Sequence, residues 1–281
     1  MSPLPLDSTP AAAYFRLHED LTRHRVDRLD VPRPAGPEFW SWYADRLRGP
    51  GTVKIRVTEG PAGGFPEPTG RLAMWSSTGM GSTHTLRLIS HLSPDVLRYE
   101  DFAAEVEPVR AGAPLPFVLA VLGAHLGYSF SYLGAVRTRA CGAPDRSGGE
   151  GNEDGPAGFA EGWNAHHDDH RLRLPTVDLT RDRLLAALPD GAEAHLSSCD
   201  LLPGGWCGDC ATCFACFYTA KAVGRPLGFT LSDRIFDEIY LRRYRPYLEG
   251  EFASDPSNSL QYLVYLQMTY GVTFDRDADV G

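Results

Sequence analysis

Five of the six cysteines lie in one short segment, and their spacing is that of a metal site. The segment reads SSCDLLPGGWCGDCATCFAC and extends from Ser197 to Cys216. Zn²⁺ takes four ligands in a tetrahedron, and a Cys-x2-Cys turn presents two thiolates to one ion. Gly208 permits a tight turn whose backbone N–H groups point at sulfur. The pattern predicts a structural zinc site with the ligands Cys199, Cys207, Cys210 and Cys213.

Two other chemistries also use clustered cysteines. Four thiolates can hold an iron–sulfur cluster, and the Cys-x2-Cys-x2-Cys run resembles that pattern too. A thioredoxin-type redox pair needs only two cysteines. In a reducing cytosol metal ligation or redox chemistry is favoured over structural disulfides, and the count of four ligands favours zinc. Cys216 remains as a spare buried thiol or an exchange ligand, and we expect no ligand role for Cys141.

A second stretch, SSTGMGSTHTL, begins at Ser76 and is rich in glycine and hydroxyl side chains. It is neither a Walker loop, because no lysine follows the glycines, nor a G-x-G-x-x-G fingerprint. It follows an apolar run and precedes a helical pattern, where backbone N–H groups attract anions. The hydroxyls of Ser77, Ser82 and Thr83 add donors, so the stretch is interpreted as a phosphate-binding loop or as a plain turn.

Two further groups of polar residues are candidates for substrate contacts. Arg137 and Arg139 follow a strand expected to end at Val136, and parallel sheets bind ligands at that end of their strands. They are interpreted as phosphate or carboxylate contacts, or as surface charge. In the WNAHHDDHR stretch, His166 and His167 are candidates for substrate contacts, and the HHDDH run could hold a metal. A solvated loop is the alternative, since the run lacks a helical ligand spacing.

The elements that must position these residues follow the order of an α/β protein. Residues 71–92 predict strand, loop and helix, and residues 114–136 predict a helix to Gly127 and then a strand over 128–136. Residues 172–191 predict a short strand and a helix with Thr180 as N-cap and Asp182 in the first turn. The patterns also predict helices over 10–30 and 37–49, a half-buried strand over 49–59 and a mobile loop over 141–162.

Length and charge bound the remaining possibilities. The 281 residues suffice for one α/β domain with appendages. The net charge of −9 makes broad nucleic-acid binding an unfavourable interpretation, and residues 199–216 contain no Lys or Arg. No stretch predicts a membrane span, and the first fifteen residues lack the features of a signal peptide, so we expect a cytoplasmic protein.

Together the two motifs resemble those of the 7-cyano-7-deazaguanine synthase family of PP-loop ATP pyrophosphatases. That family carries S-G-G-x-D-S-T after its first strand, and later a P-L-x-x-(L/W)-x-K helix before S-C-(x)n-C-G-x-C-x2-C. Here Ser77-Thr78-Gly79-Met80-Gly81-Ser82-Thr83 aligns with the loop, and PTVDLTRDRLL with the helix, Arg181 taking the lysine position. Ser198-Cys199 and Cys207-Gly208-Asp209-Cys210-x2-Cys213 match the zinc signature. The resemblance covers about residues 70–220, and Thr78, Gly81 and Cys216 depart from it.

The resemblance implies a Rossmann-like PP-loop fold with a four-cysteine zinc knuckle, in which residues 77–79 and 81–83 bind ATP with Mg²⁺ and Ser77 and Ser82 are catalytic. It implies a ligase-like enzyme that adenylates a 7-deazapurine carboxylate and forms an amide or nitrile with an ammonia donor. The alternative is a relative that binds a nucleotide or partner protein without turnover. We expect an N-terminal extension over 1–65, the PP-loop domain over 66–226 with the zinc element at 197–216, and an aromatic-rich tail over 227–281. The tail's aromatic residues fit a core or a homodimer interface.

Overall fold

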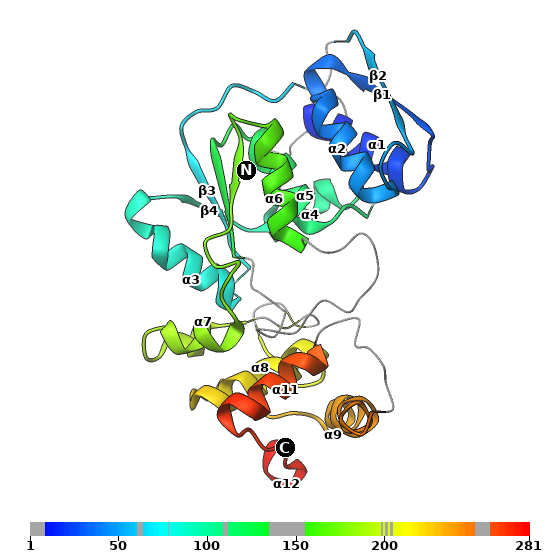
Figure 1. The fold of residues 1–281 in the computed structure, drawn as a ribbon. Coiled ribbons are helices and arrows are strands. Elements are labelled where there is room, and N and C mark those ends of the chain that lie inside the picture. Colours follow the sequence, from blue (N-terminus) through cyan, green and yellow to red (C-terminus); the bar gives the residue numbers. More distant parts are fainter. Residues whose placement is uncertain are drawn as a thin grey trace. The chain divides into compact units, whose positions relative to one another are not determined.

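The computed structural model describes residues 9–60, 64–77, 79–108, 112–134, 155–197, 199, 202, 205–250 and 259–281 (Figure 1). Its contacts form two compact units, each built from several stretches of chain. Unit 1 comprises the described parts of Met1–Ser76, Leu88–Leu133 and Gly149–Leu174. Unit 2 comprises the described parts of Ser77–Arg87, Gly134–Gly148 and Pro175–Gly281.

Unit 1 is built on a four-stranded parallel sheet. Its strand order is β4-β3-β5-β6, and Met74 of β3 pairs with Val96 of β4 and with Tyr132 of β5. The strand bounds are Leu72–Trp75 for β3, Asp95–Leu97 for β4, Phe130–Leu133 for β5 and Arg171–Arg173 for β6. Because parallel neighbours need crossover connections, helices lie between the strands along the chain.

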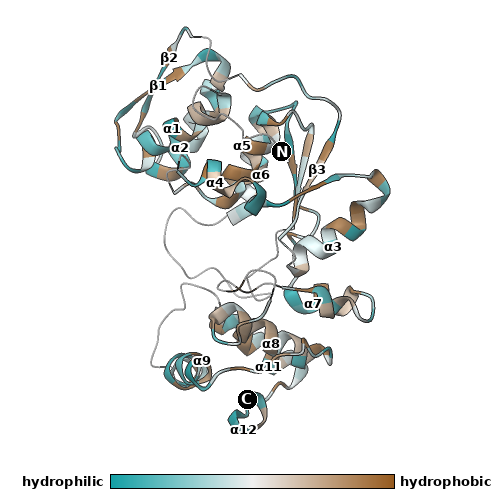
Figure 2. Cartoon of the chain, turned by 180° about the vertical axis from the view of Figure 1, so that it is seen from behind, coloured by the Kyte–Doolittle hydropathy of each residue, from teal (hydrophilic) through white to brown (hydrophobic). Residues whose placement is uncertain are grey.

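Three helices accompany this sheet: α4 (Ala103–Val106), α5 (Leu115–His125) and α6 (Gly155–His166). The α5 helix carries apolar residues on all sides and is buried from Phe117 to Ala124 (Figure 2). It lies directly on the sheet at Gly123, where a Cβ would meet the Ser131 hydroxyl of β5 at 2.1 Å. Any larger residue at position 123 would therefore separate α5 from β5.

The N-terminal part of unit 1 is a strand–helix–strand element preceded by a helix. The bounds are Pro10–Thr22 for α1, Arg28–Pro32 for β1, Pro37–Arg48 for α2 and Lys54–Thr58 for β2. The strands β1 and β2 pair in parallel, and the Thr9 side chain caps α1. The helix predicted over 37–49 is confirmed as α2, and the strand predicted over 49–59 is confirmed as β2, which begins only at Lys54. The helix predicted over 10–30 is wrong beyond Thr22, because Leu29 and Val31 alternate with exposed residues and pair with β2.

Unit 2 is mainly helical. It contains most of α3 (Met80–Ile89), and then α7 (Arg181–Ala187), α8 (Ala211–Val223), α9 (Asp233–Phe236), the π-helical segment η6 (Asp237–Tyr244), α10 (Arg245–Leu248), α11 (Ser259–Tyr270) and α12 (Arg276–Asp279). Phe214, Phe236, Tyr244 and Leu263 lie in one buried cluster. Most aromatic residues of the 229–281 tail belong to this core, as one of the two interpretations predicted; Tyr270 remains 40% exposed.

A buried carboxylate links two helices of unit 2. Asp182, in the first turn of α7, is fully buried, and its Oδ2 accepts hydrogen bonds from Tyr265 (3.0 Å) and Tyr270 (2.6 Å) of α11. Burial alone would raise the pKa of Asp182, but hydrogen bonds to its carboxylate, those from Tyr270 and Tyr265 among them, outweigh it and lower that pKa. The carboxylate is therefore ionised and joins α7 to α11.

The predicted α/β architecture with parallel strands and flanking helices is confirmed. The strand predicted over 128–136 is confirmed as β5 over residues 130–133; residues 128, 129 and 134 are not part of it, and residues 135 and 136 lie outside the described residues. Thr180 occupies the N-cap position of α7 and Asp182 lies in its first turn, as predicted, although the Thr180 hydroxyl makes no capping hydrogen bond. The loop predicted over 141–162 is wrong from Gly155 onward, where α6 begins; residues 141–154 lie outside the described part. Short 3-10 turns occur at Arg33–Ala35, Ser90–Leu92, Tyr99–Asp101 and Ala192–His195.

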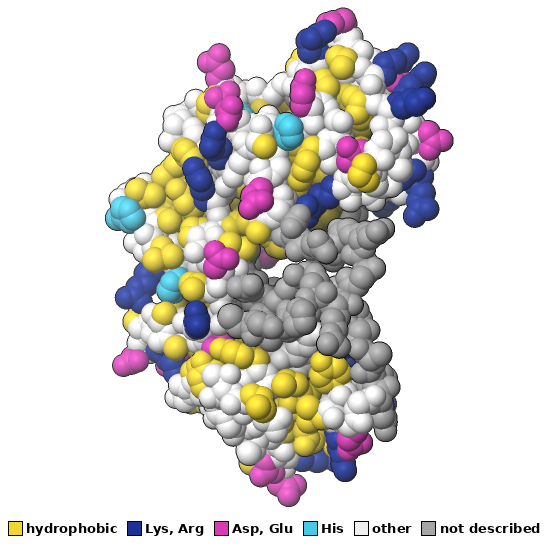
Figure 3. Space-filling view, viewed as in Figure 1, with side chains coloured by type: hydrophobic (Ala, Val, Ile, Leu, Met, Phe, Trp, Pro, Cys, Tyr) yellow, Lys and Arg dark blue, Asp and Glu magenta, His cyan; other side chains and the backbone are white. Residues whose placement is uncertain are grey.

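The described surface shows neither a candidate membrane span nor a broad basic area on the face viewed. Among the described residues no helix combines the length and the apolar character that crossing a bilayer requires. On the face shown in Figure 3, Lys and Arg side chains are interspersed with Asp and Glu. This mixture agrees with the net charge of −9 and favours no broad nucleic-acid contact on that face.

Candidate functional site

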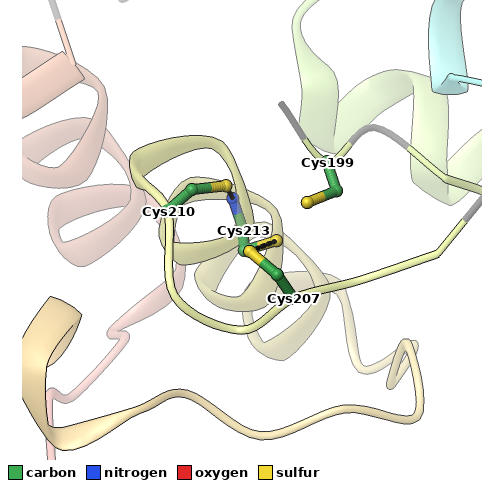
Figure 4. Close-up of side chains that lie close together, drawn as sticks. All are labelled: Cys199, Cys207, Cys210 and Cys213. Carbon is green, nitrogen blue, oxygen red and sulfur yellow. Dashed lines mark hydrogen bonds between the residues drawn. The ribbon is translucent and has the colours of Figure 1, made fainter. Parts of the chain in front are cut away.

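The four predicted zinc ligands converge in unit 2. Their Sγ atoms all lie within 4.8 Å of one another, and those of Cys207 and Cys213 are 3.8 Å apart. Zn–S bonds of about 2.3 Å in a tetrahedron separate ligand sulfurs by about 3.8 Å. In Figure 4, Cys199 comes from a separate segment and directs its sulfur toward the other three. The four cysteines could therefore hold one metal ion, and their compact arrangement fits a single ion.

Backbone amides orient the sulfurs. The N–H of Cys213 donates to Cys210 Sγ (3.4 Å), so Cys210 caps α8 with its thiol. The N–H of Asp209 donates to Cys207 Sγ (3.3 Å), and that of Leu202 donates to Cys199 Sγ (3.1 Å). Such donors offset negative charge on thiolates, so the turn is preorganised for a cation.

Gly208 allows the tight turn between Cys207 and Cys210. Its φ is +64°, in the left-handed region that favours glycine. A Cβ at this position would lie 2.3 Å from the carbonyl oxygen of Thr230. The tight turn predicted at Gly208 is confirmed. The structure also shows that the segment at Thr230 packs directly against this turn.

The electrostatics of the cysteines favour neutral thiols unless a cation is present. Burial raises the pKa of the Cys207 and Cys213 thiols. A divalent cation supplies the charge that makes four thiolates stable together. Among the described residues, these four cysteines are the only group of three or more His, Cys, Asp or Glu side chains placed to hold a metal.

Among the described residues, the remaining cysteine, Cys216, is not part of this group. Cys216 is fully buried on α8 and belongs to a cluster with Met80 of α3 and Leu185 of α7. Its position fits the interpretation as a buried packing residue. Cys141 lies outside the described residues.

The glycine-serine loop enters α3 in unit 2 and is closed by its own hydroxyls. The Ser77 N–H donates to Ser82 Oγ (3.3 Å), and the two Oγ atoms are 3.0 Å apart. Ser82 is only 5% exposed, whereas Ser77 is exposed. The N–H of Thr83 donates to the Gly79 carbonyl (2.9 Å) in the first turn of α3. Gly81 is buried there, and Thr78 lies outside the described residues.

Gly134, the residue after β5, presses against this first turn. A Cβ on Gly134 would lie 2.2 Å from the backbone nitrogen of Ser82 and 2.4 Å from the carbonyl carbon of Gly81. Backbone atoms cannot move aside as a flexible side chain can, so only glycine fits. Sequence reasoning missed this role, although Gly134 lies inside the strand predicted over 128–136, and a glycine within a strand is a signal of close backbone approach.

The histidines predicted as polar contacts have different environments. His166 is exposed at the end of α6, whereas His167 lies in the aromatic core of unit 1, stacked on Trp163 with ring centroids 3.9 Å apart. His167 Nε2 lies 2.8 Å from the Tyr14 hydroxyl and Nδ1 lies 3.1 Å from the Trp163 carbonyl oxygen. Burial lowers the pKa of His167 to about 4. Both ring nitrogens have protein partners, which favours a structural role.

The rest of the HHDDH run is divided between a buried histidine and two exposed aspartates. His170 is 8% exposed, and its ring nitrogens lie 2.9 Å from the Tyr128 carbonyl and 3.1 Å from the Pro66 carbonyl. Asp168 pairs with Arg171. The metal site predicted for this run is not found among the described residues. The solvated alternative holds for His166, Asp168 and Asp169, which are exposed, but not for the half-buried His167 or the buried His170. Arg137 and Arg139 lie outside the described residues.

Comparison with known proteins adds no relative, because no family model, no curated protein and no solved structure matches the chain.

Proposed function

We propose that the protein is an ATP-dependent, ligase-like enzyme that activates the carboxylate of a 7-deazapurine-type substrate by adenylation. The observation that carries the proposal is the succession of a β3 strand, a hydroxyl-closed loop entering α3, and a later four-cysteine cluster on one chain. This is the order of motifs in the 7-cyano-7-deazaguanine synthases. A Rossmann-like PP-loop fold is part of the same proposal.

The chain's own groups have distinct parts in this reaction. The backbone N–H groups at the start of α3 and the hydroxyls of Ser77 and Thr83 bind the pyrophosphate of ATP, with Mg²⁺ as its counterion. Ser82, held between the loop and α3, keeps that turn closed. The substrate carboxylate attacks the α-phosphorus, pyrophosphate leaves, and ammonia then displaces AMP to give the amide. A second activation dehydrates the amide to the nitrile.

The proposed metal is Zn²⁺, held by Cys199, Cys207, Cys210 and Cys213 in a structural role. Four sulfur donors at this separation suit it, and no ligand position remains open for a substrate. The bound ion supplies stability to the turn that begins α8, and all chemistry of the reaction belongs to ATP and the loop.

A pyrophosphate-release assay tests the proposal. Metal-loaded protein receives ATP, Mg²⁺, an ammonium salt and 7-carboxy-7-deazaguanine, and the expected result is substrate-dependent pyrophosphate. Ser82→Ala should abolish the signal, whereas Ser41→Ala, an exposed serine of α2, should leave it unchanged. Substrate-independent or absent pyrophosphate release contradicts adenylation of this acid.

A second candidate function rests on one observation in the loop. Gly81 stands where the family carries aspartate, and residues 76–83 contain no charged side chain. A loop without a carboxylate can bind a nucleotide through neutral donors while positioning Mg²⁺ poorly for turnover. ATP binding without pyrophosphate release would identify such a binding protein, with a partner protein or a second copy of the chain as its target.

A further inference from the structure

The turn that carries Cys207 and Cys210 is gripped from outside by a later segment of chain. Gly208 and Asp209 form the middle of this turn, and Thr230, Ser232 and Arg234 lie against it. The Ser232 N–H donates to the Gly208 carbonyl (2.9 Å), and the Ser232 hydroxyl donates to Asp209 Oδ1. Both residues between the two ligands are therefore fixed by residues that are not ligands.

Arg234 makes the most extensive of these contacts. Its Nε lies 3.1 Å from both carboxylate oxygens of Asp209, and its Nη2 donates to Oδ2 (2.8 Å) and to the Asp209 backbone carbonyl (2.5 Å). One guanidinium thus holds both the side chain and the main chain of the residue before Cys210. Its planar fork of donors makes this possible, and a lysine ammonium cannot reproduce it.

The charges around the cysteines explain why the contact between Arg234 and Asp209 affects metal binding. A divalent ion with four thiolates carries a net charge of −2, and the Asp209 carboxylate sits between two of those ligands in sequence. The same Asp209 donates its N–H to Cys207 Sγ (3.3 Å), so its position affects a ligand directly. Arg234 neutralises the carboxylate and holds the N–H in place. Groups that orient metal ligands in this way commonly change metal affinity by about 10-fold to 100-fold when they are removed.

The same segment is anchored to the end of unit 2. Ser232 caps α9 through Ile235 (3.2 Å), and the fully buried Leu231 donates its N–H to the Asp279 carbonyl (3.1 Å). Asp279 in turn accepts from Lys221 of α8 (2.7 Å). The residues that hold the cysteine turn are therefore themselves fixed by hydrogen bonds and packing within unit 2.

We propose that Arg234, acting through Asp209, is a positioning residue of the metal site, so that the chain beyond the cysteine segment sets how fast the metal is lost. This inference goes beyond the proposed reaction and does not depend on ATP. It assigns a role to the part of the chain that follows α8, which the family resemblance leaves without one.

The test is the rate of Zn²⁺ transfer from the full-length, zinc-loaded protein to a chromogenic chelator in excess. Arg234→Ala should accelerate release by about tenfold or more. Arg33→Ala is the matched control, because Arg33 makes an exposed pair with Glu59 (3.1 and 3.2 Å) in unit 1, whereas the cysteine turn belongs to unit 2. Its release rate should stay within about twofold of wild type, since exposed ion pairs contribute little by themselves.

Two further variants separate positioning from a general loss of stability. Arg234→Lys should release Zn²⁺ at a rate between those of wild type and Arg234→Ala. It keeps the positive charge but lacks the planar set of guanidinium donors. Adding Asp209→Asn to Arg234→Ala should slow release relative to Arg234→Ala alone, because it removes the uncompensated carboxylate. Co²⁺ loading checks assembly, since the tetrahedral thiolate spectrum should persist in every variant. Equal release rates for Arg234→Ala and Arg33→Ala would overturn the inference, as would a wild-type protein that binds neither Zn²⁺ nor Co²⁺.

Discussion

Replacing Gly134 with alanine is the sharpest test of the glycine-serine loop. The added Cβ would lie 2.2 Å from the Ser82 nitrogen, while ordinary contacts begin at 3.4 Å, so the two backbones must separate by about 1.2 Å. Because the neighbouring atoms are backbone, the first turn of α3 must move. A misplacement of about 1 Å can lower a reaction rate by about 100-fold where geometry is critical. We expect phosphate binding by the backbone N–H groups of this turn to be similarly sensitive. We therefore expect Gly134→Ala to weaken ATP binding by about 10-fold to 100-fold, or roughly 1.4–2.7 kcal/mol.

The assay is calorimetric titration of ATP into the full-length, metal-loaded protein. Gly60→Ala is the matched control, because a Cβ at Gly60 meets nothing within 4 Å and its φ is ordinary. Amide exchange over residues 80–84 provides a second readout that needs no ligand, and it should accelerate in Gly134→Ala alone. Wild-type affinity and wild-type exchange in Gly134→Ala would refute the steric reasoning. Altered exchange in a protein whose wild type binds no ATP would refute the nucleotide proposal and leave the steric reasoning intact.

Three other perturbations have defined outcomes. Chelating the metal should accelerate amide exchange in α8 while leaving α5 unchanged, because Cys213 and the N-cap Cys210 lie on α8; equal effects on both helices would contradict this assignment. Burial lowers the pKa of His18 and of His167 to about 4, against about 6.5 when unfolded, so the unfolded chain binds more protons between these values. The free energy of unfolding should be highest above pH 6.5 and fall by up to about 3 kcal/mol per histidine as the pH drops toward 4. Urea titrations at several pH values measure this fall. If His18→Gln keeps the full pH dependence, His18 is excluded as a cause. Asp182→Ala should cost about 1–3 kcal/mol in urea unfolding, because two tyrosine hydroxyls lose their acceptor, whereas the exposed Asp178→Ala should cost little; equal costs would show that the buried contacts contribute nothing.

The metal cluster was predictable from sequence because its geometry is set locally. Two residues between cysteines and a glycine after the first of them define a turn that presents thiolates together. The position of Cys199 is less local, and its place in the cluster followed from counting to four ligands. The contact of Asp209 with Arg234 was not predictable, because Arg234 lies on a separate helix that no spacing rule connects to Asp209.

The errors have a common physical cause, which is pairing between residues distant in sequence. The helix predicted over 10–30 includes residues 28–30, yet these residues pair with β2 as part of a strand. The three residues of β4 are too few for a pattern, and they form a strand by pairing with β3. His167 and His170 look solvated in a run of charged residues, but Tyr14, Tyr128 and Pro66 supply their partners from far away in the chain.

Each unit is built from three separate stretches of the chain, and this affects how the protein folds during its synthesis. Met80 of α3 is 3% exposed and packs in unit 2 with Leu185 and Cys216, which the ribosome adds more than a hundred residues later. At bacterial or eukaryotic synthesis rates this delay is roughly 5–20 s, during which α3 has no finished core to join. All three stretches of unit 1 are complete by Leu174, before that core exists. A nascent chain stalled at Leu174 should thus expose the apolar side of α3, the surface on which a chaperone can act.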